Sequence, residues 1–294
     1  MNLLPHDEKS PGVRELLDKY DLRPRKGLGQ HFLADPNVLH KIVEAADLST
    51  QGVVLEIGPG LGMLTRQLAQ AAGCVVAVEL DEGMLGVLRG ELAHLANLHL
   101  VQGDILQLDP ATLIRDALPS NLQSPLEYTV VANLPYYITS AAIRHLLEAD
   151  LPPRRLVLTV QREVAKRIVA GPGDMSLLAV SVQYYGQPRI VARIPAGAFV
   201  PPPKVDSAVV RIDTCIPGPS DAETFFRVAR AGFGQKRKQL KNALAAGLGR
   251  SSSDVSAAMA RAGIDSHRRA QTLSLAEWVS LAREFGSQSR VKDT

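Results

Sequence analysis

A chain of 294 residues with 46% hydrophobic content is long enough to bury a sizeable core and to form one large domain plus a small one. Its formal net charge of +3 excludes an intensely basic or acidic protein as a whole. No apolar run approaches the roughly 18 residues of a membrane span, and residues 1–12 lack the apolar core of a signal peptide, so we expect a cytoplasmic protein with no membrane partner.

The first predicted element is a helix that begins at Pro36, because Asp35 is a good N-cap and apolar residues follow at helical spacing. Strands and helices then alternate. The strands are predicted at 53–57, 75–79, 98–102, 128–132 and 156–160, and the helices at 63–71, 82–93, 111–117 and 139–148. Strands that are apolar on both faces indicate a parallel sheet covered by helices on two sides. The predicted fold class is α/β, with a doubly wound, mostly parallel sheet.

The pattern changes after residue 160. Helices are predicted at 162–170 and 176–185, and a stiff, proline-rich loop at 195–206 joins a closing strand pair at 189–194 and 207–213. Only helical patterns follow, at 222–234, 235–246, 253–262 and 275–285. We expect an N-terminal extension at 1–24, a main domain at 25–217, a small helical domain at 218–286 and a disordered tail at 287–294.

The cysteine content indicates a reducing environment. The chain has two cysteines, Cys74 and Cys215, which are far apart and match neither a disulfide framework nor the ligand spacing of a zinc site. We therefore expect no metal cofactor, and a cytoplasmic setting.

A glycine-rich turn, Glu56-Ile57-Gly58-Pro59-Gly60-Leu61-Gly62, joins the strand at 53–57 to the next helix. At such a junction the chain turns sharply and a ligand can approach the backbone. The spacing is GxGxG rather than the GxGxxG of dinucleotide-binding proteins, and Pro59 removes an amide that could hold a pyrophosphate. This favours a ligand with an amino-acid portion, although a glycine-rich turn alone also occurs in tight loops that bind nothing.

Two acidic residues follow the next two strands. Glu79 lies where a carboxylate would accept hydrogen bonds from ribose hydroxyls, and Asp104 could accept a hydrogen bond from the exocyclic amine of an adenine. Together with Gly58 and Gly60, they predict a site for an adenosyl cofactor.

The segment Asn133-Leu134-Pro135-Tyr136 follows the strand at 128–132 and indicates the chemistry. An adenine amino nitrogen is a poor nucleophile because its lone pair is delocalised, so an enzyme gains by accepting hydrogen bonds from its N–H groups. The Asn133 side-chain oxygen and the Leu134 carbonyl can accept them, Pro135 fixes the turn, and Tyr136 can stack on the base. No strong general base is needed, since the proton can leave after methyl transfer. In isolation the segment would more often be a turn with a packed tyrosine.

The stretch at 227–250 contains no Asp or Glu and is the most basic part of the chain. Its basic residues are Arg227, Arg230, Lys236, Arg237, Lys238, Lys241 and Arg250. A charge run on a helix is usually a solvated face, but one without acids resembles a phosphate footprint. We predict RNA contact by Lys236, Arg237, Lys238 and Lys241.

Several segments together resemble the ribosomal RNA adenine N6-dimethyltransferases, and most of all their bacterial small-subunit branch. They are GQHFL at 29–33, the glycine turn at 56–62, NLPY at 133–136, FVPPPKVDS at 199–207 and GQKRK at 234–238. The resemblance implies a Rossmann-like class I methyltransferase domain at 25–217 and S-adenosylmethionine as methyl donor. It also implies dimethylation of two adjacent adenines near the 3′ end of 16S rRNA, within a 30S or pre-30S particle, and a role in ribosome biogenesis. We expect the protein to be a monomer.

By position, the resemblance implies that His31 and Leu33 contact the cofactor near its methionine end. It places Asn133 between the cofactor methyl and the target amine, with Tyr136 and Phe199 on either side of the target base. Taken singly, His31 would more often be a capping residue and Phe199 a core residue.

Three alternatives stay open. A 23S rRNA adenine N6-methyltransferase of the macrolide-resistance type shares the cofactor domain and an NxPY motif, although KVDSAVV at 204–210 and QKRKQLKNAL at 235–244 look more like the small-subunit enzyme. A mainly non-catalytic ribosome-assembly factor is the second. Loss of catalysis is disfavoured by four intact residues, Glu79, Asp104, Asn133 and Tyr136. The third is a dehydrogenase, which the GxGxG spacing and the lack of a hydride site disfavour.

Overall fold

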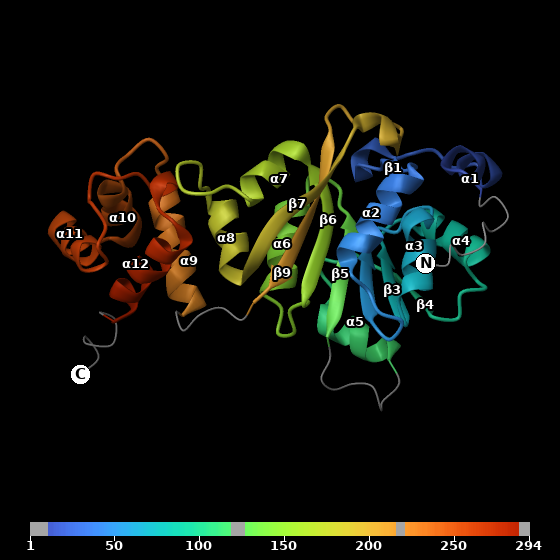
Figure 1. Ribbon diagram of the computed structural model, residues 1–294, viewed down its shortest axis with the longest axis horizontal. Coiled ribbons are helices and arrows are strands. Elements are labelled where there is room, and N and C mark those ends of the chain that lie inside the picture. The colour runs from blue at the N-terminus through green and yellow to red at the C-terminus, as the bar shows by residue number, and fades with distance from the viewer. Residues whose placement is uncertain (1–10, 119–126, 216–220, 288–294) are drawn as a thin grey trace. The chain divides into compact units, whose positions relative to one another are not determined.

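The computed structural model describes residues 11–118, 127–215 and 221–287 (Figure 1). The chain divides into two compact units, of which the first comprises Met1–Arg162 and Ile190–Ile212 and the second Glu163–Arg189 and Asp213–Thr294. The domain boundary expected at 217–218 lies outside the described residues. So does the tail predicted at 287–294, except for its first residue, Ser287, which ends a helix. Both stay predictions.

A mostly parallel sheet of seven strands organises the first unit, in the order β4-β3-β2-β5-β6-β9-β7. Its strands are β2 (Val53–Ile57), β3 (Cys74–Glu79), β4 (Leu98–Gln102), β5 (Tyr128–Asn133), β6 (Arg155–Gln161), β7 (Gly186–Ile194) and β9 (Ser207–Thr214). The pairs β2–β3, β3–β4, β2–β5 and β5–β6 are parallel. The prediction of a doubly wound, mostly parallel sheet is therefore confirmed.

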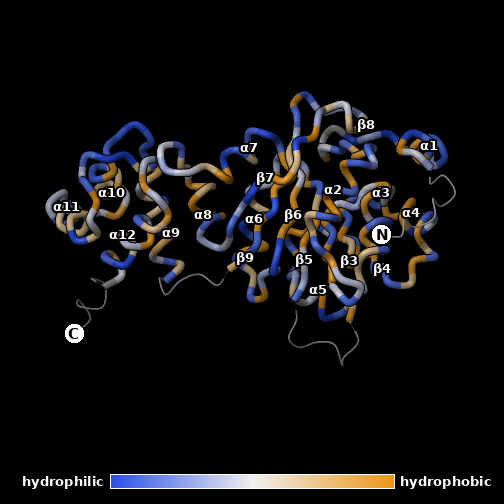
Figure 2. Tube along the Cα trace, in the orientation of Figure 1, coloured by the Kyte–Doolittle hydropathy of each residue, from blue (hydrophilic) through white to orange (hydrophobic). Residues whose placement is uncertain are grey.

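Burial on both faces explains why these segments form the centre of the sheet. Every residue of β3 is buried, and in β5 only the last residue is not. Figure 2 shows the hydrophobic colouring concentrated along β3, β5 and β6. Such strands need helices on both sides, because neither face can be left to water.

Three helices of the first unit begin at aspartates that cap them and that are recognisable in the sequence. The helices of this unit are α1 (Val13–Lys19), α2 (Pro36–Ala46), α3 (Met63–Ala71), α4 (Glu82–Glu91), α5 (Pro110–Ala117) and α6 (Thr139–Leu147). The side chains of Asp35, Asp81 and Asp109 each accept a backbone N–H at the start of α2, α4 and α5. Packing supports α2 and α3, since Leu39 and Leu68 share one core cluster with the sheet.

The connectivity creates a crevice between β2 and β5. From β2 the chain builds outward through β3 and β4, and then crosses back to place β5 on the other side of β2. Helices that leave neighbouring strands in opposite directions open a gap at the carboxyl ends of those strands, where ligands of doubly wound proteins bind. The predicted site residues follow these strand ends.

A short strand pair that we did not predict closes the same edge. β1 (Phe32–Leu33) pairs antiparallel with β8 (Phe199–Val200), with Leu33 opposite Phe199. Along the chain, η1 (Lys26–Leu28) precedes β1 and η3 (Ala196–Ala198) precedes β8. Within the extension predicted at 1–24, helix α1 buries Leu16 against Phe32 and Met84. The described part of this segment, residues 11–24, is therefore packed into the first unit.

The second unit is mostly helical and also includes the first residues of β7 and the last residues of β9. It contains α7 (Arg162–Ile168) except its first residue, together with α8 (Leu177–Tyr185), α9 (Ala222–Phe233), α10 (Leu240–Leu248), α11 (Ser252–Arg261), η4 (Ala270–Thr272) and α12 (Leu275–Ser287). Trp278 is fully buried at its core and stacks on Phe233, with ring centroids 5.1 Å apart.

One helix of this unit was predicted to start too early. The helix expected at 235–246 begins only at Leu240, and residues 234–238 form a turn in which the Lys238 N–H donates to the Gln235 carbonyl at 3.0 Å. The turn residues are exposed and offer no apolar side chain to bury, whereas Leu240 and Leu244 are fully buried. Helices in proteins depend on such an apolar face, so the basic run lies on a turn instead.

Candidate functional site

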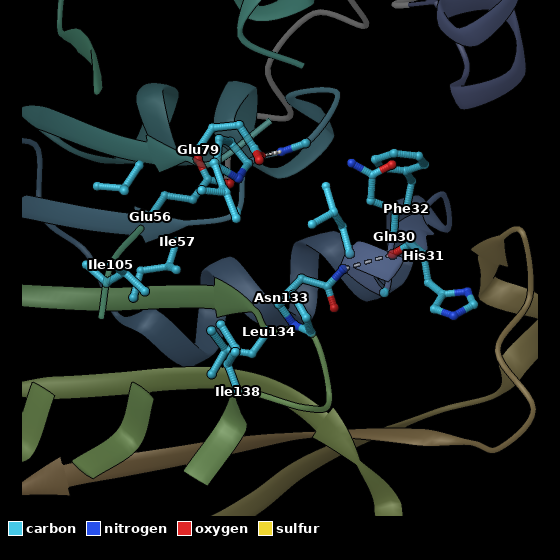
Figure 3. A pocket seen from close by; sticks show the side chains of 18 of the residues that line it. Gln30, His31, Phe32, Glu56, Ile57, Glu79, Ile105, Asn133, Leu134 and Ile138 are labelled. Carbon is cyan, nitrogen blue, oxygen red and sulfur yellow. Dashed lines mark hydrogen bonds between the residues drawn. The ribbon is translucent and has the colours of Figure 1, made fainter. Parts of the chain in front are cut away.

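A cavity of about 300 Å³ opens at the carboxyl ends of β2 to β5 in the first unit (Figure 3). Gly58 and Gly60 line it after β2, Glu79 ends β3, Asp104 follows β4 and Asn133 ends β5. The strands β1 and β8 contribute Phe32, Leu33 and Phe199, and residues 28–31 also line the cavity. The structure thus brings the predicted cofactor-binding and catalytic residues to one place.

The glycine turn has a backbone conformation that favours glycine. Gly58, Gly60 and Gly62 have φ angles of +69°, +58° and +80°. At Gly60 space is limiting as well, because a Cβ atom would lie 3.0 Å from the ring of Phe32. The Gly60 N–H also donates to the Glu79 carboxylate at 3.0 Å, so this turn and the acidic strand end form one structure.

We expect Gly60→Ala to lower the unfolding temperature and the affinity for an adenosyl ligand, because the substitution combines a strained φ with a clash at Phe32. A destabilisation of about 1–3 kcal/mol is reasonable for such strain. Thermal unfolding with and without ligand measures both effects. Gly86→Ala is the matched control: Gly86 lies in α4 with open space around it, so alanine should stabilise by roughly 0.5–1 kcal/mol. Equal behaviour of the two variants would contradict this account.

Glu79 is buried and its carboxylate is held in place by backbone donors. Its two oxygens accept hydrogen bonds from the N–H groups of Gly60 at 3.0 Å and Asp81 at 2.9 Å. Burial raises the pKa of Glu79 above its ordinary value, while these hydrogen bonds act in the opposite direction. Each oxygen keeps a lone pair that can accept from a ligand hydroxyl, as the predicted ribose contact requires.

Asp104 is arranged in a similar way at the end of β4. Its Oδ1 accepts the Leu106 N–H at 3.0 Å, and no described residue donates to Oδ2. The side chain lines the cavity, so Oδ2 is available to an amine of a bound ligand.

Glu56 is a site residue for which the sequence analysis found no role. It is the only charged residue of β2, is 1% exposed and lines the cavity, and its Oε2 has no hydrogen-bond partner among the described residues. Burial raises its pKa from 4.5 to about 8, and the charge of Glu79 adds to this, while the neighbouring Thr65 side chain acts in the opposite direction. A glutamate within an otherwise apolar strand was the signal in the sequence. An unpaired buried acid carries a free-energy cost that a ligand can offset, so such a residue indicates a binding role.

Asn133 has its amide fixed by a distant backbone group. Its Nδ2 donates to the His31 carbonyl at 3.0 Å, as the dashed line in Figure 3 shows. Since a carbonyl can only accept, Nδ2 must face His31, and Oδ1 is left as the free acceptor. Leu134 is buried next to it, and the Pro135 carbonyl accepts the Ile138 N–H at 3.2 Å, which closes the turn before α6. The segment therefore presents acceptors in a rigid setting.

Two aromatic residues complete the cavity wall. The Tyr136 hydroxyl and the Ser207 hydroxyl are hydrogen-bonded at 2.9 Å, which fixes the Tyr136 ring. Phe199 is 2% exposed and is held by the pairing of β8 with β1. Both rings line the cavity. Their arrangement on either side of a base stays a prediction.

His31 contributes in a way that the sequence did not indicate. Its Nδ1 lies 2.7 Å from the Pro201 carbonyl and so must carry the proton, and its ring stacks near that of Tyr136, with centroids 6.3 Å apart. In Figure 3 the imidazole is directed away from Glu79, and the backbone carbonyl of His31 faces Asn133. The predicted contact of His31 with a cofactor stays a prediction.

The predicted RNA-binding residues belong to the second unit. Lys236, Arg237 and Lys238 are exposed on the turn between α9 and α10, and Lys241 lies in the first turn of α10. All residues that line the cavity belong to the first unit.

Among the described residues, no group of three or more His, Cys, Asp and Glu side chains is placed to hold a metal ion. Cys74 is buried and Cys215 is exposed, and both are free thiols. None of the helices in the described ranges has the length and apolar character that crossing a membrane requires.

The family model for ribosomal RNA adenine dimethylases matches residues 22–286. The chain belongs to the ribosomal RNA adenine dimethylase family. Among its relatives are proteins named ribosomal RNA small subunit methyltransferase A. The one from Dehalococcoides mccartyi strain CBDB1 is 49% identical over 93% of this chain and 92% of its own length. The one from Pelotomaculum thermopropionicum is 43% identical over 93% and 95%.

Solved structures share the fold of this ribosomal RNA adenine dimethylase family member. The 23S rRNA methyltransferase ErmE is 28% identical, with a TM-score of 0.68 over 87% of this chain and 99% of its own. A dimethyladenosine transferase from Plasmodium falciparum has a TM-score of 0.74 at 24% identity, over 88% and 98% of the two chains.

Proposed function

We propose that this protein transfers methyl groups from S-adenosylmethionine to N6 of two adjacent adenines near the 3′ end of 16S rRNA, producing N6,N6-dimethyladenine. The observation that carries the proposal is the fixed amide of Asn133, whose Oδ1 is a free acceptor at the end of β5. Family membership and the relatives named for the small ribosomal subunit support the same reaction.

The residues around the cavity fit S-adenosylmethionine. Glu79 would accept from the ribose hydroxyls and Asp104 from the adenine amine. The unpartnered Oε2 of the buried Glu56 suits the ammonium of the methionine portion, which would offset the cost of burying a carboxylate. Gly58 and Gly60 leave room for close approach to the backbone, and Leu33 would add an apolar contact. When bound, S-adenosylmethionine supplies an electrophilic methyl group on a sulfonium.

Asn133 and Leu134 would activate the target amine. Acceptance of its two N–H hydrogens by the Asn133 Oδ1 and the Leu134 carbonyl localises the nitrogen lone pair and favours the tetrahedral geometry of the transition state. Tyr136 would stack on the adenine, and the buried Phe199 would form an apolar wall. The proton then leaves a positively charged nitrogen, which needs no strong base. Pro135 contributes by fixing the turn that aligns these groups.

The choice of 16S rRNA as substrate rests on the relatives. The 49% identity to a small-subunit enzyme exceeds the 28% identity to the 23S enzyme, which supports 16S rRNA over 23S rRNA. A monomer that acts in the cytoplasm on a 30S or pre-30S particle, with a role in ribosome biogenesis, is part of the proposal. Neither a purely non-catalytic assembly role nor a dehydrogenase accounts for the acceptors at Asn133.

The test uses purified protein, labelled S-adenosylmethionine and 30S particles from a strain that lacks this methylation. We expect label in 16S rRNA, and primer extension should stop at two adjacent adenines near its 3′ end. Label in 23S rRNA only would support the macrolide-resistance type. Binding to the particles without any label would support the assembly factor.

Neutralising the basic turn should weaken RNA binding and reduce its dependence on salt. For every phosphate that is no longer neutralised by a basic side chain, the slope of log affinity against log salt falls by about 0.7–0.9. For Lys236→Gln/Arg237→Gln/Lys238→Gln we therefore expect a slope that is smaller by roughly 2–3, with S-adenosylmethionine affinity unchanged. Lys41→Gln, on the exposed face of α2, is the control. An unchanged slope for the triple variant would remove the basic turn from the RNA interface.

A further inference from the structure

We propose that Tyr137 is a binding platform for the nucleobase next to the target adenine. The inference rests on the proposed function, because it concerns the RNA strand that the same cavity would receive. Five large hydrophobic residues are exposed in the described part of the chain, and Tyr137, at 64%, is the most exposed of them. An exposed aromatic ring at the edge of a cavity is a typical contact residue, since its flat face binds without a large entropy cost.

The turn before α6 gives Tyr136 and Tyr137 different surroundings. The hydrogen bond from the Ile138 N–H to the Pro135 carbonyl, at 3.2 Å, makes the two tyrosines the central residues of one turn. Tyr136 is anchored through Ser207, whereas the Tyr137 hydroxyl has no hydrogen-bond partner among the described residues. Both side chains line the same cavity. One tyrosine is thus fixed within the site, and its neighbour presents most of its surface to solvent.

One edge of the Tyr137 ring lies near the chain at Gly29. A Cβ atom placed on Gly29 would lie 3.4 Å from the Pro135 Cβ and 3.8 Å from the Tyr137 Cε1. Gly29 has a φ of +63°, so the chain turns beside the ring edge. One edge of the Tyr137 ring therefore lies near Gly29, and the rest of the side chain, which is mostly exposed, is available for stacking a ligand.

The chemistry of the substrate explains why a second platform is useful. An adenine must leave its base stack to enter a closed cavity, and its neighbour in the strand is then without a stacking partner on that side. Because Tyr136 and Tyr137 are consecutive, an RNA strand with one base stacked on Tyr136 brings its next base towards Tyr137. Stacking on the exposed ring takes the place of the departed adenine, and it tolerates different bases because every base has a π-face.

The experiment measures steady-state kinetics on unmethylated 30S particles with the wild type, Tyr137→Ala and Tyr137→Phe. We expect Tyr137→Ala to raise KM for the particles by roughly 5- to 150-fold, as removal of one base-stacking aromatic ring does. The kcat and the Kd for S-adenosylmethionine should stay within about two-fold of wild type, and Tyr137→Phe should behave as wild type because it keeps the ring. Ile190→Ala, which shortens a hydrophobic side chain that is 37% exposed on β7, is the matched control.

The outcomes separate this inference from the proposed function. A wild-type protein that labels no 16S rRNA contradicts the proposed function itself. If the wild type is active, an unchanged KM in Tyr137→Ala overturns the inference. So does a loss of S-adenosylmethionine affinity, which would make Tyr137 a cover of the cofactor, or a fall in kcat alone, which would make it a support for Tyr136. Failure of Tyr137→Phe would show that the hydroxyl, and not stacking, is what matters.

Discussion

Replacing Asn133 by alanine should lower kcat by about 10²–10³-fold while S-adenosylmethionine still binds. The size follows from removing one fixed polar group that acts on the charge developing at the reacting nitrogen. Oδ1 is available for this role because Nδ2 is held by the His31 carbonyl at 3.0 Å. Single-turnover methylation and equilibrium binding of the cofactor, measured on the same preparation, separate the two effects.

Asn97→Ala provides a matched control for this experiment. Asn97 also donates its Nδ2 to backbone carbonyls, those of Ala69 at 2.8 Å and Ala72 at 2.9 Å, but it does not line the cavity. That variant should lose thermal stability and keep its turnover per folded molecule. If Asn133→Ala turned over at a near-normal rate, the acceptor role assigned to its Oδ1 would be wrong.

Replacing Glu56 by glutamine should weaken cofactor binding and stabilise the ligand-free protein. The ammonium of S-adenosylmethionine would lose a buried carboxylate, and hydrogen bonds to charged groups contribute roughly 1.5–3 kcal/mol, or about 10- to 150-fold in Kd. The expected stabilisation of the ligand-free protein has a different cause. Oε2 is unpartnered in a side chain that is 1% exposed, so the ionised form carries a cost that the neutral amide avoids.

The raised pKa of Glu56 determines how the free energy of unfolding changes with pH. The pKa of Glu56 is raised from 4.5 to about 8 by burial, so between these values the folded protein binds a proton that the unfolded chain has released. The stability contributed by this group is therefore fully present below pH 4.5 and is lost as the pH rises towards 8, by up to roughly 1.4 kcal/mol per pH unit. Wild type and Glu56→Gln should unfold alike near pH 5 and diverge towards pH 8, with the variant more stable.

Denaturant unfolding across this pH range and titration calorimetry with S-adenosylmethionine check both halves of the prediction. Glu82→Gln, an exposed acid in the first turn of α4, serves as the control. It should leave cofactor binding unchanged and lower the stability by no more than about 1 kcal/mol, equally at pH 5 and pH 8. A Glu56→Gln variant that is less stable than the wild type at pH 8, or that binds the cofactor equally well, would show that Glu56 is a structural residue only.

Much of the first unit was predictable because its signals are local. The bounds of β2, α3 and β4 agree with the predicted ranges to the residue, since apolar strands, left-handed glycines and strand-end acids act within a few positions. The candidate cofactor residues followed from the same rule, because the carboxyl ends of parallel strands meet at one edge of a sheet. Burial along the chain and motif spacing are sufficient for this level of description.

The remaining features depend on contacts between distant segments. The pairing of β1 with β8 carries the His31 carbonyl to Asn133, and Tyr136 meets Ser207 across the same edge. The late start of α10 at Leu240 reflects which side chains find a core to enter. By itself the sequence determined which residue types stand at the strand ends and which chemistry they suit. Only the tertiary structure decided which atoms of those residues are occupied by partners and which stay free for a ligand, because hydrogen bonds and burial are settled by groups far apart in the chain.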